Sequence, residues 1–223
     1  MQMTGKSHGT LRLQVYEQLR EGILLGKYPR GSALTEIKLA EELGVSRTPV
    51  REAFCQLELD GLVAATPNKG VVVDGFDQAD MLDMYDVRTR MESLAASRAA
   101  DKMSQEDIRQ LRLLFEQEVE LAANSNYREL QRSDAAFHDL IFRGSGSRVL
   151  QNILSSINIY TKQARFISLS TRGRTEQVLQ EHASILEAIE ARDAVLAGRQ
   201  MQTHIEKAAA SYRRLAAETG GSQ

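Results

Sequence analysis

The sequence has few of the features that mark secreted or membrane-embedded proteins. Its single cysteine, Cys55, cannot form a disulfide within one chain, so a reducing cytoplasm is the expected compartment. No run of about 18 apolar residues is present, and a transmembrane helix is therefore not expected. Residues 1–10 are polar and lack the apolar stretch of a secretory signal. No association with a membrane is predicted.

The sequence also lacks a charge excess. It contains 28 lysines and arginines and 30 aspartates and glutamates. Residues 1–75 contain nine basic and nine acidic residues. Any case for nucleic-acid binding must therefore rest on where individual charges lie. The hydrophobic fraction of 42% is large enough for a folded core.

Proline is rare and confined to one part of the chain. Pro29, Pro49 and Pro67 are the only prolines, and the residues after them have helical periodicity. The strand-like apolar runs, near 62–65 and 71–73, also lie in the first third. We therefore predict two domains, residues 1–75 and residues 76–223, in a mostly α-helical protein.

The first domain has the element order of a winged helix-turn-helix. A helix with Leu11 and Val15 on one face comes first, and a second is expected over about residues 35–43. Gly44 can end that helix in the left-handed conformation. Ser46 is expected to cap a third helix, from Arg47 to about residue 60, through the N–H of Thr48. Two short strands follow.

The second domain is predicted to be an all-helical bundle. Short breaks separate the helices, which favours antiparallel neighbours. The expected helices cover residues 77–100, 104–123, 126–143, 146–168, 173–191 and 193–216.

The start of the third helix carries the candidate DNA-reading residues. Arg47 and Arg51 are four residues apart and project from one face, and arginine can pair with guanine in the major groove. Ser46 and Thr48 complete the first turn, whose free N–H groups suit phosphate. As isolated residues, the two arginines could equally be solvated surface charges. That alternative does not account for the turn glycine, the cap and the wing that accompany them.

This stretch closely resembles the DNA-binding domain of the GntR family of bacterial regulators. The resemblance covers about residues 10–74 and includes Gly44 to Ala53, Asp60 to Val63 and Gly70. It implies that Arg47, Thr48, Arg51, and Lys69 and Gly70 of the wing contact DNA. Some members have a DNA-contacting arginine where this chain has Ile37, so either Lys38 substitutes or that contact is absent.

Three of the four histidines lie on apolar stripes of the second domain. Asp134 and His138 share one helix face, whereas His182 and His204 belong to two later helices. A buried aspartate needs a partner. Convergence of these four side chains would form a site for Zn²⁺, Ni²⁺ or another first-row divalent ion such as Mn²⁺. The alternative is three ordinary helix histidines and a solvated aspartate.

The second domain resembles the FCD domain of the FadR subfamily within GntR. The resemblance covers about residues 77–216, and its segments include Tyr85 to Glu92, Asp134 to His138, Glu181 to Ile189 and Met201 to His204. Many such domains bind one metal through an aspartate and three histidines. The resemblance therefore implies that Asp134, His138, His182 and His204 are metal ligands, with zinc the first candidate.

Arg88 shares a helical stripe with Met81 and Tyr85, so its guanidinium faces the bundle core and needs an anion. Glu92, one turn later, is one possible partner. A carboxylate ligand held between Arg88 and the metal is the other, and the subfamily often senses organic acids. Tyr160 is a second effector-binding candidate, although it and Arg165 could instead pack a dimer.

These predictions combine into a ligand-controlled regulator. A homodimer would place two recognition helices on a palindromic operator. A small organic acid beside the metal would then release the protein from DNA or retain it there, and the resemblance favours repression. One alternative is a constitutive regulator with a purely structural metal. A metal-dependent enzyme is disfavoured, because no motif places a general base.

Overall fold

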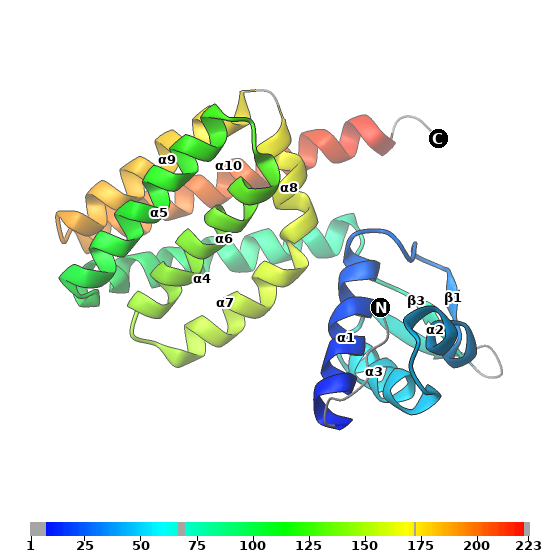
Figure 1. The fold of residues 1–223 in the computed structure, drawn as a ribbon. Coiled ribbons are helices and arrows are strands. Elements are labelled where there is room, and N and C mark those ends of the chain that lie inside the picture. Colours follow the sequence, from blue (N-terminus) through cyan, green and yellow to red (C-terminus); the bar gives the residue numbers. More distant parts are fainter. Residues whose placement is uncertain (1–7, 67–69, 172, 221–223) are drawn as a thin grey trace. The chain divides into compact units, whose positions relative to one another are not determined.

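The computed structural model describes residues 8–66, 70–171 and 173–220. The chain divides into two compact units, Met1–Asp77 and Gln78–Gln223. Figure 1 shows a small unit that contains a sheet and a larger unit built from helices alone. Across the described residues, no helix is both long enough and apolar enough to cross a membrane.

The first unit is a winged helix-turn-helix. Its helices are α1 (His8–Leu24), α2 (Glu36–Leu43) and α3 (Arg47–Leu59), and its strands are β1 (Ala33–Leu34), β2 (Val63–Thr66) and β3 (Gly70–Val73). The sheet is antiparallel in the order β1-β3-β2. Strand β1 was not predicted from the sequence. It has only two residues, too few for an alternating pattern, and it exists because Leu34 pairs with Val71 across the sheet.

The turn between α2 and α3 confirms one expectation and corrects another. Gly44 is left-handed (φ 66°, ψ 36°), and its N–H donates to the carbonyls of Ala40 and Glu41. Ser46 is the N-cap residue of α3, but its side chain makes no capping hydrogen bond. The predicted bond to the N–H of Thr48 is therefore wrong. Pro49 lacks an N–H, so one of the two donors that a capping side chain can use is missing.

The second unit contains seven described helices. They are α4 (Gln78–Lys102), α5 (Gln105–Ala123), α6 (Tyr127–Gly144), α7 (Arg148–Tyr160), α8 (Lys162–Ser170), α9 (Arg174–Glu190) and α10 (Ala194–Gly220). Helix α4 packs along α10, and α5 packs along α6. The apolar core includes Phe137, Ile141, Ile185 and Met201, all fully buried.

The helix predicted over residues 146–168 is two helices, and the break between α7 and α8 falls at Thr161. The Thr161 hydroxyl donates to the carbonyls of Ile157 and Asn158, at 3.4 Å in each case. A threonine that bonds back to the preceding turn bends a helix. The Gln131 side chain also donates to the Lys162 carbonyl. The apolar pattern continues across the break and therefore did not reveal it.

We expect Leu111→Ala to destabilise the helical unit by about 2–5 kcal/mol, because Leu111 is fully buried in the core and its loss leaves a cavity. Leu113→Ala on the same helix is the matched control, since Leu113 is 55% exposed. Its effect should stay within about 0.5 kcal/mol. Guanidinium denaturation followed by circular dichroism measures both, and equal effects would contradict this packing.

Candidate nucleic-acid interface and candidate metal centre

Two exposed arginines of α3 are held on one carboxylate of α2. Arg51 donates from Nε to Glu36 Oε1 at 2.8 Å and from Nη2 to Oε2 at 3.0 Å. Arg47 donates to Glu36 Oε2 from Nε at 3.1 Å and from Nη2 at 3.0 Å. Hydrogen bonds from Arg51, and then from Arg47, outweigh burial and lower the pKa of Glu36 to about 2. Both guanidinium groups therefore lie on one face, next to the Glu36 carboxylate.

The other predicted DNA-reading residues of the helices lie at the surface. Ser46, Thr48 and Lys38 are exposed. Gly70 begins β3 with a φ of +82°, and a Cβ there would lie 2.4 Å from the Leu34 carbonyl oxygen. Glycine is thus required at this position by the sheet itself. Lys69, also predicted to contact DNA, lies outside the described residues.

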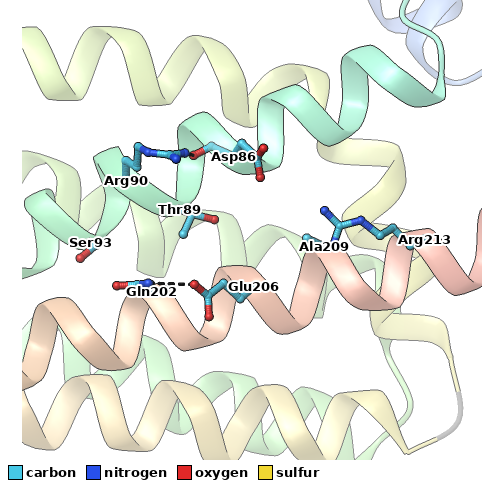
Figure 2. A pocket seen from close by; sticks show the side chains of 8 residues that line it. All are labelled: Asp86, Thr89, Arg90, Ser93, Gln202, Glu206, Ala209 and Arg213. Carbon is cyan, nitrogen blue, oxygen red and sulfur yellow. Dashed lines mark hydrogen bonds between the residues drawn. The ribbon is translucent and has the colours of Figure 1, made fainter.

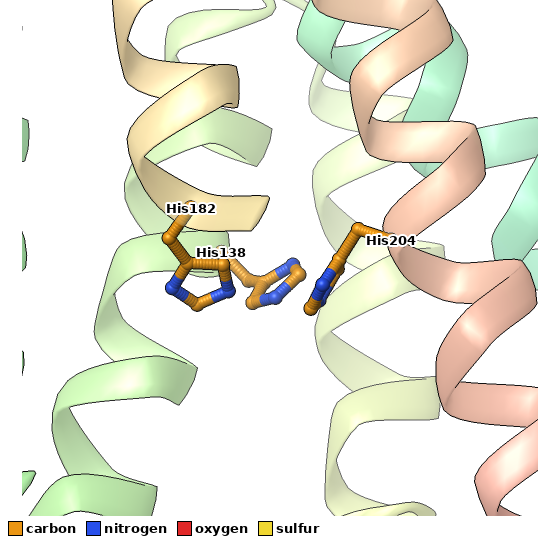
Figure 3. Close-up of side chains that lie close together, drawn as sticks. All are labelled: His138, His182 and His204. Atoms are coloured by element: carbon orange, nitrogen blue, oxygen red, sulfur yellow. The ribbon is translucent and has the colours of Figure 1, made fainter. Parts of the chain in front are cut away.

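Three histidines from three helices meet at the centre of the second unit. His138 of α6, His182 of α9 and His204 of α10 are buried, and each offers a ring nitrogen within 4.8 Å of the other two. Figure 3 shows the three rings facing a common space. We call this group the histidine cluster. Asp134 lies one turn before His138, with Oδ1 3.8 Å from His182 Nε2. The three predicted histidine ligands are therefore brought together, and Asp134 lies beside His182.

Each ring of the histidine cluster is oriented by a buried glutamate. The distance from Nδ1 to a carboxylate oxygen is 2.7 Å in each pair: His138 with Glu92, His182 with Glu118 and His204 with Glu181. An ionised carboxylate can only accept a hydrogen bond, so Nδ1 carries the proton and Nε2 keeps its lone pair. The Nε2 atoms of His138 and His182 are buried and have no hydrogen-bond partner.

Burial and neighbouring charges set the ionisation of the cluster. Burial lowers the pKa of His138, and burial lowers the pKa of His204 to about 3. Burial also acts to lower the pKa of His182, but Glu118 outweighs it and the pKa is raised. Burial acts to raise the pKa of Asp134, but the charges of Arg165 and the three histidines together outweigh it, and the pKa is lowered. A metal binds neutral imidazoles and an ionised carboxylate, and the lowered pKa values of His138, His204 and Asp134 favour these forms.

These residues fit a divalent ion. Two buried imidazole nitrogens without a partner would be costly in an apolar bundle, and a cation would satisfy both. Three nitrogens and one carboxylate oxygen form a donor set typical of zinc and other first-row ions. The three glutamates are the outer-shell partners that metal-bound histidines usually have.

A small cavity beside His204 is lined by three buried arginines. Its volume is about 20 Å³, and its lining residues include Arg88, Arg165, Arg174 and Asp134. Arg88 Nε donates to Glu92 Oε1 at 2.6 Å, so Glu92 is the partner of Arg88 that the sequence offered. Arg88 also lines the cavity. Arg165 Nε lies 2.8 Å from Asp134 Oδ2. Arg174 binds Glu181 with both terminal nitrogens, at 2.9 and 3.0 Å.

Several of these residues were not identified from the sequence. The site also includes Glu118, Glu181 and Arg174, because the packing of helices places partners next to them. The spacing of residues within one helix does not reveal such partners. Arg165 was left between two roles, and the structure places it at the cavity. Tyr160 ends α7 and is not among the residues that line this cavity. Its role in effector binding stays a prediction.

A second hollow lies between α4 and α10, on the surface of the same unit (Figure 2). Its volume is about 340 Å³. Its charged side chains are Asp86, Arg90, Glu206 and Arg213, all of them exposed. Two acidic and two basic groups in water are strongly screened. This hollow therefore lacks the buried, oriented polar groups of the histidine cluster.

Comparisons with known proteins agree with both units. The family described as "Bacterial regulatory proteins, gntR family" matches residues 11–73, and the FCD domain matches residues 83–207. The uncharacterized HTH-type transcriptional regulator YdhC of Bacillus subtilis (strain 168) is 31% identical over 193 residues, covering 86% of this chain and 86% of that protein. The HTH-type transcriptional repressor RspR of Escherichia coli (strain K12) is 25% identical over 205 residues, covering 92% and 90%.

A solved structure supports the fold alone. E. coli McbR/YncC has a TM-score of 0.75 and 20% identity, and the match covers 92% of this chain and 98% of that one. The matched families and relatives are transcription regulators and not enzymes. The winged helix-turn-helix unit and the helical unit therefore both match known proteins, and the matches cover most of the length of the curated relatives. The chain belongs to the GntR family of bacterial transcription regulators, in the FadR-like group that carries an FCD domain.

Proposed function

We propose that this regulator binds operator DNA through α3 and the wing, and that a small carboxylate at the buried histidine cluster controls this binding. The observation that carries the proposal is the orientation of three imidazoles by three glutamates, which directs nitrogen lone pairs toward one buried point. Such an arrangement is costly unless a cation is bound there. We further propose that the protein acts as a repressor in the bacterial cytoplasm.

The DNA-reading face is proposed to be Ser46, Arg47, Thr48 and Arg51, with Lys38, Lys69 and Gly70 nearby. Support comes from the exposed guanidinium groups of α3 and from the free N–H groups of its first turn. Glu36 orients both arginines, so little side-chain freedom would be lost on binding. A homodimer would present two such faces to a palindromic operator.

The metal is proposed to be held by Asp134, His138, His182 and His204. Zinc is the first candidate, with nickel or manganese as alternatives, because the donor set suits several first-row ions. The bound ion would supply a positive charge and an open coordination position for a carboxylate oxygen. Asp134 would remain paired with Arg165 through its second oxygen, and this pairing fixes the carboxylate in place.

The effector is proposed to bind in the arginine-lined cavity, with Arg88 as one contact. An effector changes DNA affinity only as far as its own affinity differs between two states of the protein. The connection near Asp74 to Asp77 is where the two units join, and a change of state in the sensor would be transmitted there.

The small size of the cavity favours one alternative. A volume of about 20 Å³ holds little more than a water molecule. A purely structural metal in a constitutive DNA-binding protein would need no more space. Under that alternative, metal loading would change stability, and no organic acid would change operator affinity.

We expect Arg51→Ala to weaken operator binding by about 1–3 kcal/mol, because a bidentate contact to a base edge would be lost. The operator is first selected from random duplexes with the wild-type protein, and affinity is then measured by fluorescence anisotropy. Arg109→Ala is the matched control, since Arg109 is also exposed and paired with a nearby glutamate, but on α5. Equal affinities for the Arg51 variant and the wild type would contradict the assignment.

We expect about one divalent ion per chain in protein purified without a tag or added metal. The Asp134→Ala/His138→Ala variant should lose it, because two of four ligands are removed. His8→Ala is the control, since His8 is the one histidine outside the helical unit. Elemental analysis measures the metal. Full occupancy in the double variant, or no metal in the wild type after reconstitution, would overturn the proposed site.

A further inference from the structure

Two positive charges at the start of α3 share a single negative charge. Arg47 and Arg51 both form their ion pairs with Glu36 of α2. Their side chains are 58% and 61% exposed, whereas the side chain of Glu36 is 21% exposed. The carboxylate is thus the more enclosed member of this group, and a molecule that approaches the surface meets the guanidinium groups first.

The bonds to Glu36 use one edge of each guanidinium group. Arg47 and Arg51 both donate from Nε and Nη2, and Nη1 takes no part in these bonds. A guanidinium group has five N–H donors, so the edge formed by Nη1 and the second hydrogen of Nη2 is left over in both residues. Two parallel N–H groups on that edge match O6 and N7 of guanine, and they also match two oxygens of a phosphate.

The charge of Glu36 distinguishes these two acceptors. A phosphate is an anion, so a phosphate on the left-over edge of Arg47 or Arg51 is repelled by the carboxylate on the other edge. The edge of a guanine base carries no net charge and meets no such repulsion. Nonspecific binding depends on phosphate contacts, whereas sequence is read from base edges. The carboxylate therefore weakens nonspecific binding more than it weakens the reading of bases.

We propose that Glu36 is a specificity-determining residue, which disfavours contacts of Arg47 and Arg51 with backbone phosphates and leaves both arginines available for guanine. This inference rests on the proposed DNA-reading face and adds the residue that limits nonspecific binding. The ion pairs are exposed, and such pairs are weak in water. The penalty on phosphate contacts is therefore expected to be severalfold and does not exclude them.

The local structure keeps Glu36 in place for this role. Glu36 is the first residue of α2, and the N-cap residue Thr35 accepts a hydrogen bond from the Lys38 N–H at 3.4 Å. A carboxylate in the first turn of a helix is favoured by the helix dipole. Gly44 ends α2 in the left-handed conformation, and α2 packs against α3. The tight turn thus brings the start of α3 back to the start of α2.

The test compares operator DNA with a scrambled duplex of the same length and base composition. Operator selected with the wild type and the scrambled duplex are each titrated with full-length wild type, Glu36→Gln and Glu36→Ala, and fluorescence anisotropy is measured at several salt concentrations. The alanine variant is included because glutamine can itself pair with adenine. We expect both variants to bind the scrambled duplex about three- to tenfold more tightly than the wild type, and the ratio of operator to scrambled affinity to fall at least about threefold.

The salt dependence reports the mechanism. Each arginine that gains a phosphate contact steepens the plot of log affinity against log salt concentration by about 0.9. With the scrambled duplex, the slope for both Glu36 variants should therefore be steeper by about 1 to 2 per chain. A residue that only stabilised the fold would not change this slope. Circular dichroism establishes that each variant is folded.

Two controls isolate the effect of Glu36. Glu41→Gln removes the same charge from an exposed position of the same helix. It should keep the wild-type ratio and slope, because the arginines pair with Glu36. In the Arg47→Ala/Arg51→Ala background, Glu36→Gln should no longer steepen the slope, since neither arginine remains to contact a phosphate.

The outcomes separate this inference from the proposed function. A wild type that prefers no duplex sequence would refute the DNA-reading face itself. If the wild type discriminates and both Glu36 variants keep its ratio, the inference is overturned and the reading face stands. A ratio that falls with an unchanged salt slope would also overturn it, because Glu36 would then act on the operator complex alone. The same applies if Glu36→Gln steepens the slope in the background without both arginines.

Discussion

The helical unit depends on the mutual compensation of charges at its centre. Glu92 joins Arg88 to His138, and Glu181 joins Arg174 to His204, so each carboxylate satisfies a guanidinium and an imidazole at once. Removal of one partner would leave another group buried and unpaired, which is far more costly than the pair is favourable. These contacts connect α4, α5, α6, α8, α9 and α10. They therefore specify how the helices pack around the site as well as what the site can bind.

The same pairing of arginine with carboxylate has a different consequence in the winged helix-turn-helix unit. Glu36 holds Arg47 and Arg51 at the surface, where their side chains are 58% and 61% exposed. Water screens such pairs and makes them weak, so a phosphate or a base edge can compete for the guanidinium groups. In the bundle, the pair of Arg174 with Glu181 has no such access to water. Solvent exposure thus separates arginines suited to exchange partners from arginines that maintain a structure.

The break between α7 and α8 has a direct effect on the site. Arg165 lies four residues after Thr161, and its Nη2 donates across the break to Asn158 Oδ1 at 3.0 Å. Asn158 in turn donates to Asp139 of α6 at 3.1 Å. These bonds fix Arg165 where its Nε meets Asp134. The bend at Thr161 therefore places Arg165 of α8 against Asp134, a predicted metal ligand.

The local features of the chain follow from its amino-acid sequence. Glycine and proline positions and apolar periodicity are properties of single elements, and they were sufficient to predict the winged helix-turn-helix and the helical bundle. The assignment of Asp134, His138, His182 and His204 as metal ligands also needed the resemblance to the FCD domain. The structure alone decided the partners. The pairing of His182 with Glu118, and the meeting of Arg88, Arg165 and Arg174 at one cavity, join residues from different helices. Periodicity within a helix gives the face of a residue, but only the packing of helices decides which residue lies opposite.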